Sequence, residues 1–232
     1  MKTALITGAS SGIGYAITKR VLSLGYRVIG VSRTISNELF EDKNFIAIQS
    51  DLSSEDGVQQ LLSHIKYESI TLLIHSAGFG RFDPHETLDM QTITKMTFLN
   101  LTAPMLLTNA LLRDLKKNDG YLIHINSIEA LRASKFAGVY SATKAGLKAF
   151  GDALFEETRK SGLSITNINP DMTQTPFYDA LRFQTSQKED EKLLADDIAD
   201  AIEHILTMRK GAVVSEYTIR SLKFGIVKKS LK

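Results

Sequence analysis

The sequence predicts an α/β fold in which seven parallel strands form one doubly wound sheet with helices on both faces. Short apolar runs alternate with longer segments of helical pattern along the chain, which is typical of a parallel sheet. The chain has 232 residues, a length that favours one domain, and it contains no internal repeat, low-complexity segment or linker. We therefore expect residues 1–232 to form a single domain.

The first strand is expected at residues 3–7, followed by a glycine-rich turn and a helix that stops at Gly25. Glycines let the backbone approach a pyrophosphate, and the free N–H groups of a helix N-terminus favour negative charge. No GK[ST] sequence follows, so a nucleoside-triphosphate loop is a poor match. The pattern predicts phosphate binding rather than an ordinary tight turn. The residues of this loop are Gly8, Ser10, Ser11, Gly12, Ile13 and Gly14.

The second strand is expected at residues 26–32 and ends at Ser32-Arg33-Thr34, where dinucleotide-binding folds meet the adenosine ribose. An acidic residue there binds the free 2′-hydroxyl of NAD, but none occurs before Glu38. A guanidinium suits the 2′-phosphate of NADP. We therefore predict NADP(H) as the cofactor, the alternative being that Arg33 is a solvated loop charge.

The next two strands are expected at residues 44–49 and 70–75. Asp51-Leu52 follows the first, and Asp51 can either reach the adenine or cap a turn. Ser76-Ala77-Gly78 follows the second, and its small residues allow close approach of a ribose or nicotinamide. His75 is interpreted as a hydrogen-bonded core residue.

A long helix is expected over residues 90–117, with an interruption or bend at Pro104. Asn100 inside it is either exposed or engaged by polar partners. The remaining elements are a strand at 121–125, a helix at 137–161, a strand at 163–168, a helix at 195–208 and a strand at 211–215.

Residues 171 to about 192 have weak periodicity, and we predict a substrate loop there with short helices, or else a variable surface loop. Its aromatic side chains at 177–183 suggest an apolar substrate. The tail at 219–232 mixes basic and apolar residues, and we expect it to be solvated or to pack against a subunit rather than bind a membrane. Its basic residues are Arg220, Lys223, Lys228, Lys229 and Lys232.

Ser127, Tyr140 and Lys144 are the candidate catalytic residues. Tyr140 and Lys144 are four residues apart on an expected helix and therefore share a face. A nearby ammonium lowers the pKa of a phenol from about 10, and a serine hydroxyl can hold a carbonyl oxygen. Ser76, Ser127 and Pro170 all follow strands, which collects them with the glycine loop at the ligand-binding edge of the sheet. The group is suited to exchanging a proton with a carbonyl or alcohol oxygen, although an exposed helix pair and a turn cap are the alternatives.

Bulk properties exclude several other classes. Composition is ordinary for a globular protein, with 43% hydrophobic and 23% charged residues, and the net charge of +2 gives no electrostatic reason to expect nucleic acid binding. The absence of cysteine excludes disulfides and thiol catalysis, and the histidine spacing predicts no metal site. With no predicted signal peptide or membrane span, we expect a cytoplasmic protein that binds no membrane.

Together, these motifs resemble the short-chain dehydrogenase/reductase family in its common form. The ordered matches, which extend from residue 3 to residue 175, are Thr7 to Gly14, Asp51, Ala77-Gly78, Asn100, Ser127, Tyr140-Ser141-Ala142-Thr143-Lys144 and Pro170 to Thr175. The resemblance implies a Rossmann-like sheet with strand order 3-2-1-4-5-6-7. It also implies homodimers or homotetramers formed through the helices that carry Asn100 and Tyr140.

The resemblance also implies a role for each residue of the site. Tyr140 would be the general acid/base, and Ser127 would position the substrate oxygen. Lys144 would lower the pKa of the tyrosine and bind the nicotinamide ribose, while Asn100 would bend its helix and help to hold a water. The nicotinamide would lie near Pro170, Thr173 and Thr175.

The sequence departs from the family pattern at two places. His75-Ser76-Ala77-Gly78 stands where the family has NNAG, so the bracing asparagine amides are missing. Pro170-Asp171 stands where the family has PG, and the added acid would either tune a pocket or face solvent. Glu129, two residues after Ser127, would either line the pocket or be a charge at its rim.

We therefore predict an NADP(H)-dependent oxidoreductase that transfers a hydride between nicotinamide and a carbonyl or secondary alcohol substrate. The alternatives are an NAD-preferring dehydrogenase, or a cofactor-binding regulatory or scaffold protein on the same fold. The complete set of Asn100, Ser127, Tyr140 and Lys144 argues against the scaffold protein.

Overall fold

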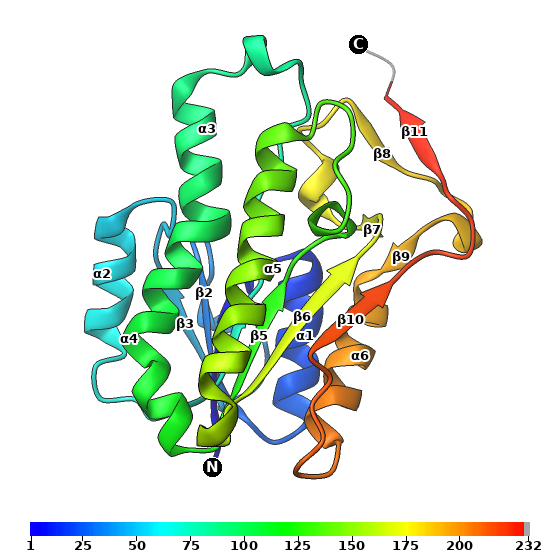
Figure 1. Ribbon diagram of the computed structural model, residues 1–232. Helices are drawn as coiled ribbons and strands as arrows, with labels where there is room; N and C mark the ends of the chain where they lie inside the picture. The colour runs from blue at the N-terminus through cyan, green and yellow to red at the C-terminus, as the bar shows by residue number, and fades with distance from the viewer. Residues whose placement is uncertain (230–232) are drawn as a thin grey trace.

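A seven-stranded parallel sheet lies between two layers of helices in the computed structural model, which describes residues 1–229 (Figure 1). The strand order is β10-β6-β5-β4-β1-β2-β3, and each neighbouring pair is parallel. Read from the opposite edge, this is the order that the family resemblance implied. The predicted α/β fold with its doubly wound sheet is confirmed.

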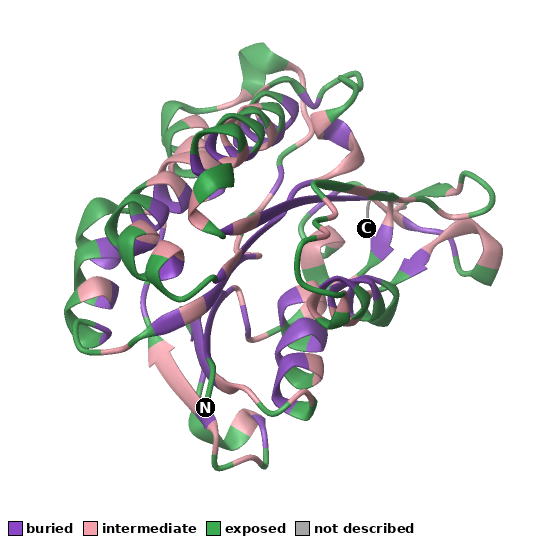
Figure 2. Ribbon diagram, turned by 60° about the horizontal axis from the view of Figure 1, so that its bottom comes forward, coloured by how far each residue is buried: buried purple, intermediate pink, exposed green. Residues whose placement is uncertain are grey.

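The strands at the centre of the sheet are apolar on both faces, because helices cover both sides. All five residues of the first strand are buried, and Figure 2 shows the central strands buried between helices with exposed outer faces. The strands are β1 (Thr3–Thr7), β2 (Arg27–Ser32), β3 (Phe45–Gln49), β4 (Ile70–His75), β5 (Tyr121–Ile125), β6 (Ser164–Pro170) and β10 (Glu216–Ile219).

The helices divide into two layers, each with its own apolar core. The helices are α1 (Gly12–Ser23), α2 (Glu55–His64), α3 (Met90–Thr97), α4 (Ala103–Lys117), α5 (Gly138–Thr158) and α6 (Ala195–Thr207). Ile17 of α1 and Ile202 of α6 belong to one buried cluster, while Leu61 of α2, Leu107 of α4 and Leu154 of α5 belong to the other. Among residues 1–229, no helix has both the length and the apolar composition to cross a membrane.

The interruption predicted at Pro104 is wrong in position. A π-helical turn, Phe98–Thr102, joins α3 to α4, and Asn100 is fully buried within it. Pro104 instead lies in the first turn of α4, where a proline is tolerated. Single π turns occur frequently at functional sites, and this one aims the Asn100 amide at neighbouring elements.

The strand predicted at 211–215 is also wrong, because the seventh strand, β10, begins at Glu216. Gly211 has a φ of 90° and belongs to a turn. The segment before β10 nevertheless runs beside β6, since the carbonyl of Val214 accepts a hydrogen bond from Thr166 Oγ1 at 2.6 Å.

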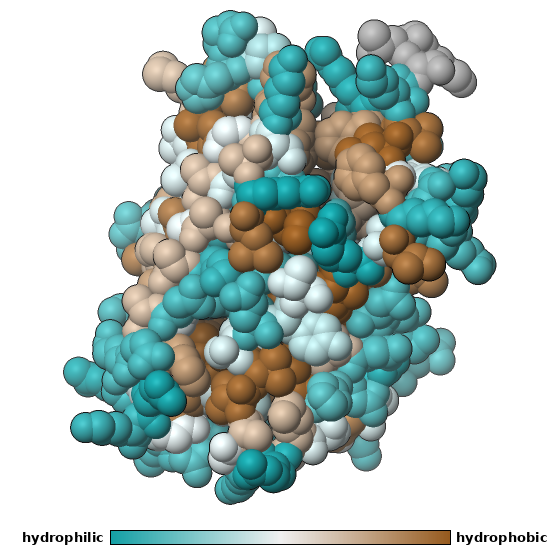
Figure 3. Space-filling view, turned by 45° about the vertical axis from the view of Figure 1, so that its right-hand side comes forward, coloured by the Kyte–Doolittle hydropathy of each residue, from teal (hydrophilic) through white to brown (hydrophobic). Residues whose placement is uncertain are grey.

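The predicted substrate loop contains more strand than expected, and the C-terminal tail pairs with it. β7 (Thr173–Gln174) pairs with β9 (Leu193–Leu194), and β8 (Phe183–Thr185) pairs with β11 (Ile226–Lys228). The tail is therefore not simply solvated, because β11 pairs with β8. Brown areas in Figure 3 show apolar side chains at the surface on the face that carries β10 and β11. Lys232, one of the basic residues of the tail, lies outside the described residues.

We expect Gly57→Ala to lower the free energy of unfolding by about 1–3 kcal/mol, because an overpacked side chain forces the backbone to shift. Gly57 lies in the first turn of α2, and a Cβ there would overlap the carbonyl oxygen of Asp51, which precedes the helix. Gly138→Ala is the matched control, because a Cβ there would meet no described atom within 4 Å. Chemical denaturation measures both variants, and equal midpoints for the two would contradict the prediction.

Candidate functional site

The turns that follow the strands enclose a cleft of about 670 Å³ at the carboxyl edge of the sheet. Every predicted site residue except Asn100 lines it. The predicted residues in the lining are Gly8, Ser10, Ser11, Gly12, Ile13, Gly14, Ser32, Arg33, Thr34, Asp51, Leu52, Ser76, Ala77, Gly78, Ser127, Tyr140, Lys144, Pro170, Thr173 and Thr175. Residues from six strand ends and α5 thus meet in one place.

The glycine loop after β1 is a cradle of bare backbone. A Cβ on Gly8 would lie 2.8 Å from the backbone nitrogen of Ala77, and one on Gly14 would overlap the carbonyl oxygen of Gly8. Ser11 makes no side-chain cap at the start of α1, and the first turn of that helix contains no acidic residue. The positive end of the α1 dipole therefore faces the cleft without an anionic side chain of its own, which fits the phosphate groups of a dinucleotide.

Thr7 braces the floor of the cleft where the family asparagines are missing. Its Oγ1 accepts hydrogen bonds from the backbone nitrogens of Ser76 and Ala77, both at 3.1 Å. His75 is buried, and its Nε2 lies 3.0 Å from Thr108 Oγ1. The interpretation of His75 as a hydrogen-bonded core residue is confirmed.

Asp51 and Arg33 lie at the end of the cleft expected to meet the adenosine. Burial opposes ionisation of Asp51, but hydrogen bonds from Ser53 and the charges of Arg33 and Lys95 outweigh it and lower the pKa of the carboxyl. One oxygen of Asp51 caps the turn by accepting a hydrogen bond from the Ser53 nitrogen at 3.0 Å. In the part of the chain that the structure describes, Arg33 forms no ion pair, so its guanidinium is available to a ligand.

Asn100 is not exposed inside its helix, because its amide is engaged by polar partners on two neighbouring segments. Its Oδ1 accepts a hydrogen bond from the Phe79 nitrogen at 3.1 Å, and its Nδ2 donates to the Phe79 carbonyl at 2.9 Å. Nδ2 also lies 3.2 Å from Thr143 Oγ1 on α5. Asn100 therefore joins the segment after β4 to the helix that carries Tyr140 and Lys144.

Tyr140 and Lys144 lie side by side on the buried face of α5. Lys144 Nζ donates to the Ile125 carbonyl at 2.9 Å and lies 5.9 Å from the centre of the Tyr140 ring. Burial raises the pKa of Tyr140 to about 12, against a hydrogen bond with Ser127 that acts to lower it. The net direction is opposite to the lowering expected from Lys144. The pKa of Lys144 itself is lowered by burial to about 8.

Aromatic side chains cover the Tyr140 phenol. The ring of Phe82 lies 5.2 Å from the ring of Tyr140, and the ring of Phe177 lies 5.8 Å from it. Phe183 of β8 packs edge-on against Phe82 at 5.2 Å. Phe177 and Phe183 belong to the predicted substrate loop, so this loop supplies part of the apolar wall around the phenol.

Several cleft residues were not found from the sequence. Lys95 and Leu99 line the cleft, and their spacing of four residues was an available signal. Asn126 also lines the cleft, and its buried Oδ1 has no hydrogen-bond partner within residues 1–229. An unsatisfied acceptor in such a place is consistent with a bound ligand that donates to it.

Asp171 neither faces solvent nor stands alone. It is 7% exposed, and its Oδ2 lies 3.2 Å from Arg220 Nε. Its Oδ1 lies 3.9 Å from a terminal nitrogen of Arg132. The acid that replaces the family glycine is therefore neutralised by two arginines at the wall of the cleft.

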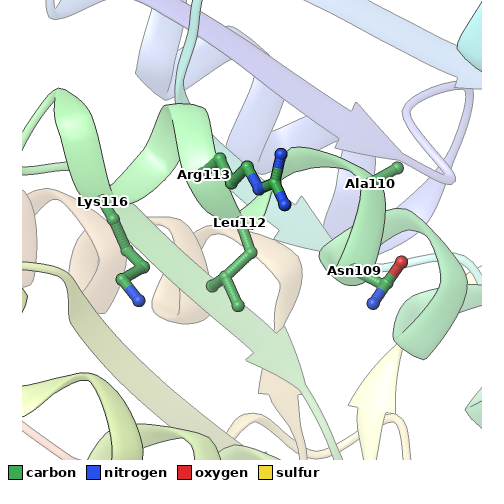
Figure 4. A pocket seen from close by; sticks show the side chains of 5 residues that line it. All are labelled: Asn109, Ala110, Leu112, Arg113 and Lys116. Carbon is green, nitrogen blue, oxygen red and sulfur yellow. The ribbon is translucent and has the colours of Figure 1, made fainter.

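A second hollow of about 560 Å³ lies on the outer face of α4 (Figure 4). Its lining residues are Asn109, Ala110, Leu112, Arg113 and Lys116, which all belong to that one helix. It shares no residue with the cleft at the sheet edge.

Comparison with known proteins gives one consistent result. A family model described as short chain dehydrogenase matches residues 2–186. An uncharacterised oxidoreductase of Staphylococcus epidermidis is 30% identical over 226 residues, which cover 94% of this chain and 96% of the relative.

Two solved structures share the fold. An alcohol dehydrogenase of the archaeon Thermococcus sibiricus, complexed with 5-hydroxy-NADP, superposes with a TM-score of 0.86 at 26% identity over 96% of this chain and 97% of that one. A 4-hydroxyisoleucine dehydrogenase complexed with NADH gives 0.83 at 23% identity, over 95% and 98%. The fold thus accommodates either nicotinamide cofactor.

We expect Lys144→Met to raise the midpoint of thermal unfolding at neutral pH. Lowering a lysine pKa from 10.5 to about 8 corresponds to roughly 3 kcal/mol of unfavourable burial, which exceeds the roughly 1 kcal/mol from its hydrogen bond to Ile125. Between pH 8 and pH 10.5, Lys144 is protonated in the unfolded chain and largely deprotonated in the folded chain. The stability of the wild-type protein therefore rises with pH in this range, and the advantage of methionine shrinks.

Calorimetry at neutral pH and near pH 10 measures both effects. Lys148→Met is the matched control, because Lys148 on the same helix forms ion pairs with Asp152 and Glu216 and should not be stabilised by its removal. A lower midpoint for Lys144→Met than for the wild-type protein would contradict the prediction.

Proposed function

The chain belongs to the short-chain dehydrogenase/reductase family of NAD(P)-dependent oxidoreductases, and from this premise we propose that it uses NADP(H) to interconvert a carbonyl compound and a secondary alcohol. One observation carries the proposal. Ser127, Tyr140 and Lys144 line the same cleft as the uncapped N-terminus of α1. A proton-exchanging group and a phosphate cradle are the two parts that such a reaction requires.

Each part of the cleft suits one part of the cofactor. The glycine loop from Gly8 to Gly14 would hold the pyrophosphate, and Arg33 would bind the 2′-phosphate. Asp51 and Leu52 would contact the adenine, with Ser76, Ala77 and Gly78 beside the ribose. Pro170, Thr173 and Thr175 would surround the nicotinamide, which supplies or accepts the hydride when it is bound.

The protein's own residues manage the proton. Tyr140 is protonated at neutral pH, because burial raises its pKa to about 12, so it is prepared to donate a proton to a carbonyl oxygen. The Ser127 hydroxyl holds that oxygen, and the Lys144 ammonium stabilises the phenolate that the transfer leaves behind.

The buried lysine argues against a scaffold protein on the same fold. An ammonium held in an apolar site destabilises the folded chain, and such perturbed groups cluster at functional sites. A protein that only bound the cofactor could use Lys144 to bind the ribose, but it would have no use for the Tyr140 phenol in the same cleft.

Arg33 favours NADP(H) over NAD(H). It lines the cleft directly after β2, without an ion-pair partner among the described residues.

We further propose a homodimer or homotetramer that associates through α4 and α5. Leu106 of α4 is 38% exposed although it is apolar. The hollow on the outer face of α4 in Figure 4 would be covered by a second copy.

We expect Tyr140→Phe to lower the turnover of a carbonyl substrate at least about a hundredfold, because the proton donor is lost while the apolar packing stays. NADPH affinity, followed by fluorescence, should change little. Tyr121→Phe, which removes a hydroxyl at the start of β5, is the control. Retained turnover in Tyr140→Phe would overturn the assignment of the acid.

We expect Arg33→Ala to weaken NADPH binding by about tenfold to a hundredfold and to leave NADH binding nearly unchanged. A charge-assisted hydrogen bond to a phosphate contributes about 1.5–3 kcal/mol, and NADH has no 2′-phosphate. Fluorescence titration with both cofactors measures the difference, with Arg113→Ala on α4 as the control. Equal losses for both cofactors would remove Arg33 from the phosphate site.

A further inference from the structure

A buried carboxylate lies two residues after Ser127. Glu129 belongs to the 3-10 turn Ile128–Ala130 and is 8% exposed. It is not among the described residues that line the cleft. Both sequence-based readings of Glu129, a pocket wall and a charge at the rim, are therefore wrong.

Groups of the chain itself occupy both carboxylate oxygens of Glu129. Oε1 accepts from Ser134 Oγ at 2.6 Å and lies 3.4 Å from Arg132 Nε. Oε2 accepts from the Ser134 nitrogen and from Ser141 Oγ, both at 2.9 Å. A side chain engaged in this way has little capacity to bind substrate, so its function must be sought in what it connects.

The bonds of Glu129 connect the two residues that would act on the substrate oxygen. Its backbone nitrogen donates to Ser127 Oγ at 3.2 Å. Its carboxylate accepts from Ser141, the residue that follows Tyr140 on α5. One residue thus ties the turn that carries Ser127 to the helix turn that carries Tyr140.

The Glu129 carboxylate is ionised and acts on Tyr140 through its charge. Burial works against ionisation, but hydrogen bonds from Ser134 and Ser141 and the charge of Arg132 outweigh it and lower the pKa of Glu129. Burial is the main cause of the raised pKa of Tyr140, and the negative charge of Glu129 raises it further.

Other ionisable groups surround this pair on each element packed against it. They are Lys144 on α5, Arg132 after the 3-10 turn, Asp171 at the end of β6, Arg220 after β10 and Tyr178 in the substrate loop. Arg220 is bound to Asp171, and Arg132 lies between the two acids, 3.4 Å from Glu129 and 3.9 Å from Asp171. Of the two acids, Glu129 is the one whose charge raises the pKa of Tyr140.

We propose that Glu129 is a positioning residue, whose hydrogen bonds hold Ser127 and Tyr140 in register and whose negative charge acts on the Tyr140 phenol. This inference rests on the proposed function of Tyr140 as the acid. It assigns one effect to the hydrogen bonds of Glu129 and another to its charge, and two substitutions separate them.

Glu129→Gln removes the charge and keeps the shape and one oxygen acceptor. The Tyr140 phenol should then ionise at a pH lower by about one unit, because a neighbouring negative charge is lost. Near-ultraviolet absorbance follows phenolate formation, and subtracting the titration of the corresponding Tyr140→Phe protein isolates Tyr140 among the seven tyrosines. Turnover at neutral pH should stay near the wild-type value, since the phenol remains protonated there.

Glu129→Ala removes the hydrogen bonds of the carboxylate as well and leaves the backbone bond to Ser127 in place. Carbonyl reduction should fall by about tenfold to a hundredfold, as expected when reacting groups are misplaced, while NADPH affinity remains unchanged. Ser141→Ala deletes only the arm to α5, without removing the carboxylate, and should cause a smaller loss of the same kind. Glu156→Gln, on the exposed side of α5, is the control and should change neither quantity.

Three results would overturn the proposal. One is an unchanged titration of Tyr140 in Glu129→Gln, and another is wild-type turnover in Glu129→Ala. The third is a parallel loss of turnover, NADPH affinity and thermal stability in both Glu129→Ala and Ser141→Ala, which would indicate a merely structural role. The phenol titration needs no substrate, so if the wild-type protein reduced no carbonyl compound, the proposed function would fail while the effect of the Glu129 charge would still be measured.

Discussion

The close approach of two backbone segments underlies the whole cleft. The turn after β1 packs on the segment after β4 so tightly that a Cβ on Gly8 would lie 2.8 Å from the Ala77 nitrogen. Thr7 secures this contact through two hydrogen bonds to the same segment. Because backbone meets backbone there, the N-terminus of α1 stays open toward the cleft, and the strand ends that carry Ser76 and Ser127 are brought near it.

Burial shifts the proton affinities of Tyr140 and Lys144 in opposite directions. Removal from water disfavours the charged form of each, so the phenol keeps its proton more firmly and the ammonium holds its proton less firmly. The pKa values of the two groups are thereby moved apart, from 10.0 and 10.5 to about 12 for Tyr140 and about 8 for Lys144. A hydrogen bond with Ser127 acts to lower the pKa of Tyr140 and the charge of Glu129 acts to raise it, which links local packing to proton transfer.

Local sequence signals predicted the sheet, the glycine loop and the catalytic helix, because apolar periodicity and turn residues determine these elements over a few residues. Features that depend on distant partners were not predictable in this way. The strand at 211–215 is displaced because its pairing with β6 decides its position. The π turn around Asn100 depends on contacts with Phe79 and Thr143. Glu129 looked like a pocket residue because nothing in the local pattern indicates that Ser134 and Ser141 would enclose it. The cytoplasmic location stays a prediction.

The pairing of β8 with β11 links two regions that are distant in the sequence. The Phe183–Thr185 strand of the substrate loop is hydrogen-bonded to Ile226–Lys228, and the Lys229 nitrogen donates to the Arg182 carbonyl at 2.9 Å. A substitution in the segment around β11 would therefore act on the aromatic wall around Tyr140 through Phe183, without any substitution in the cleft itself.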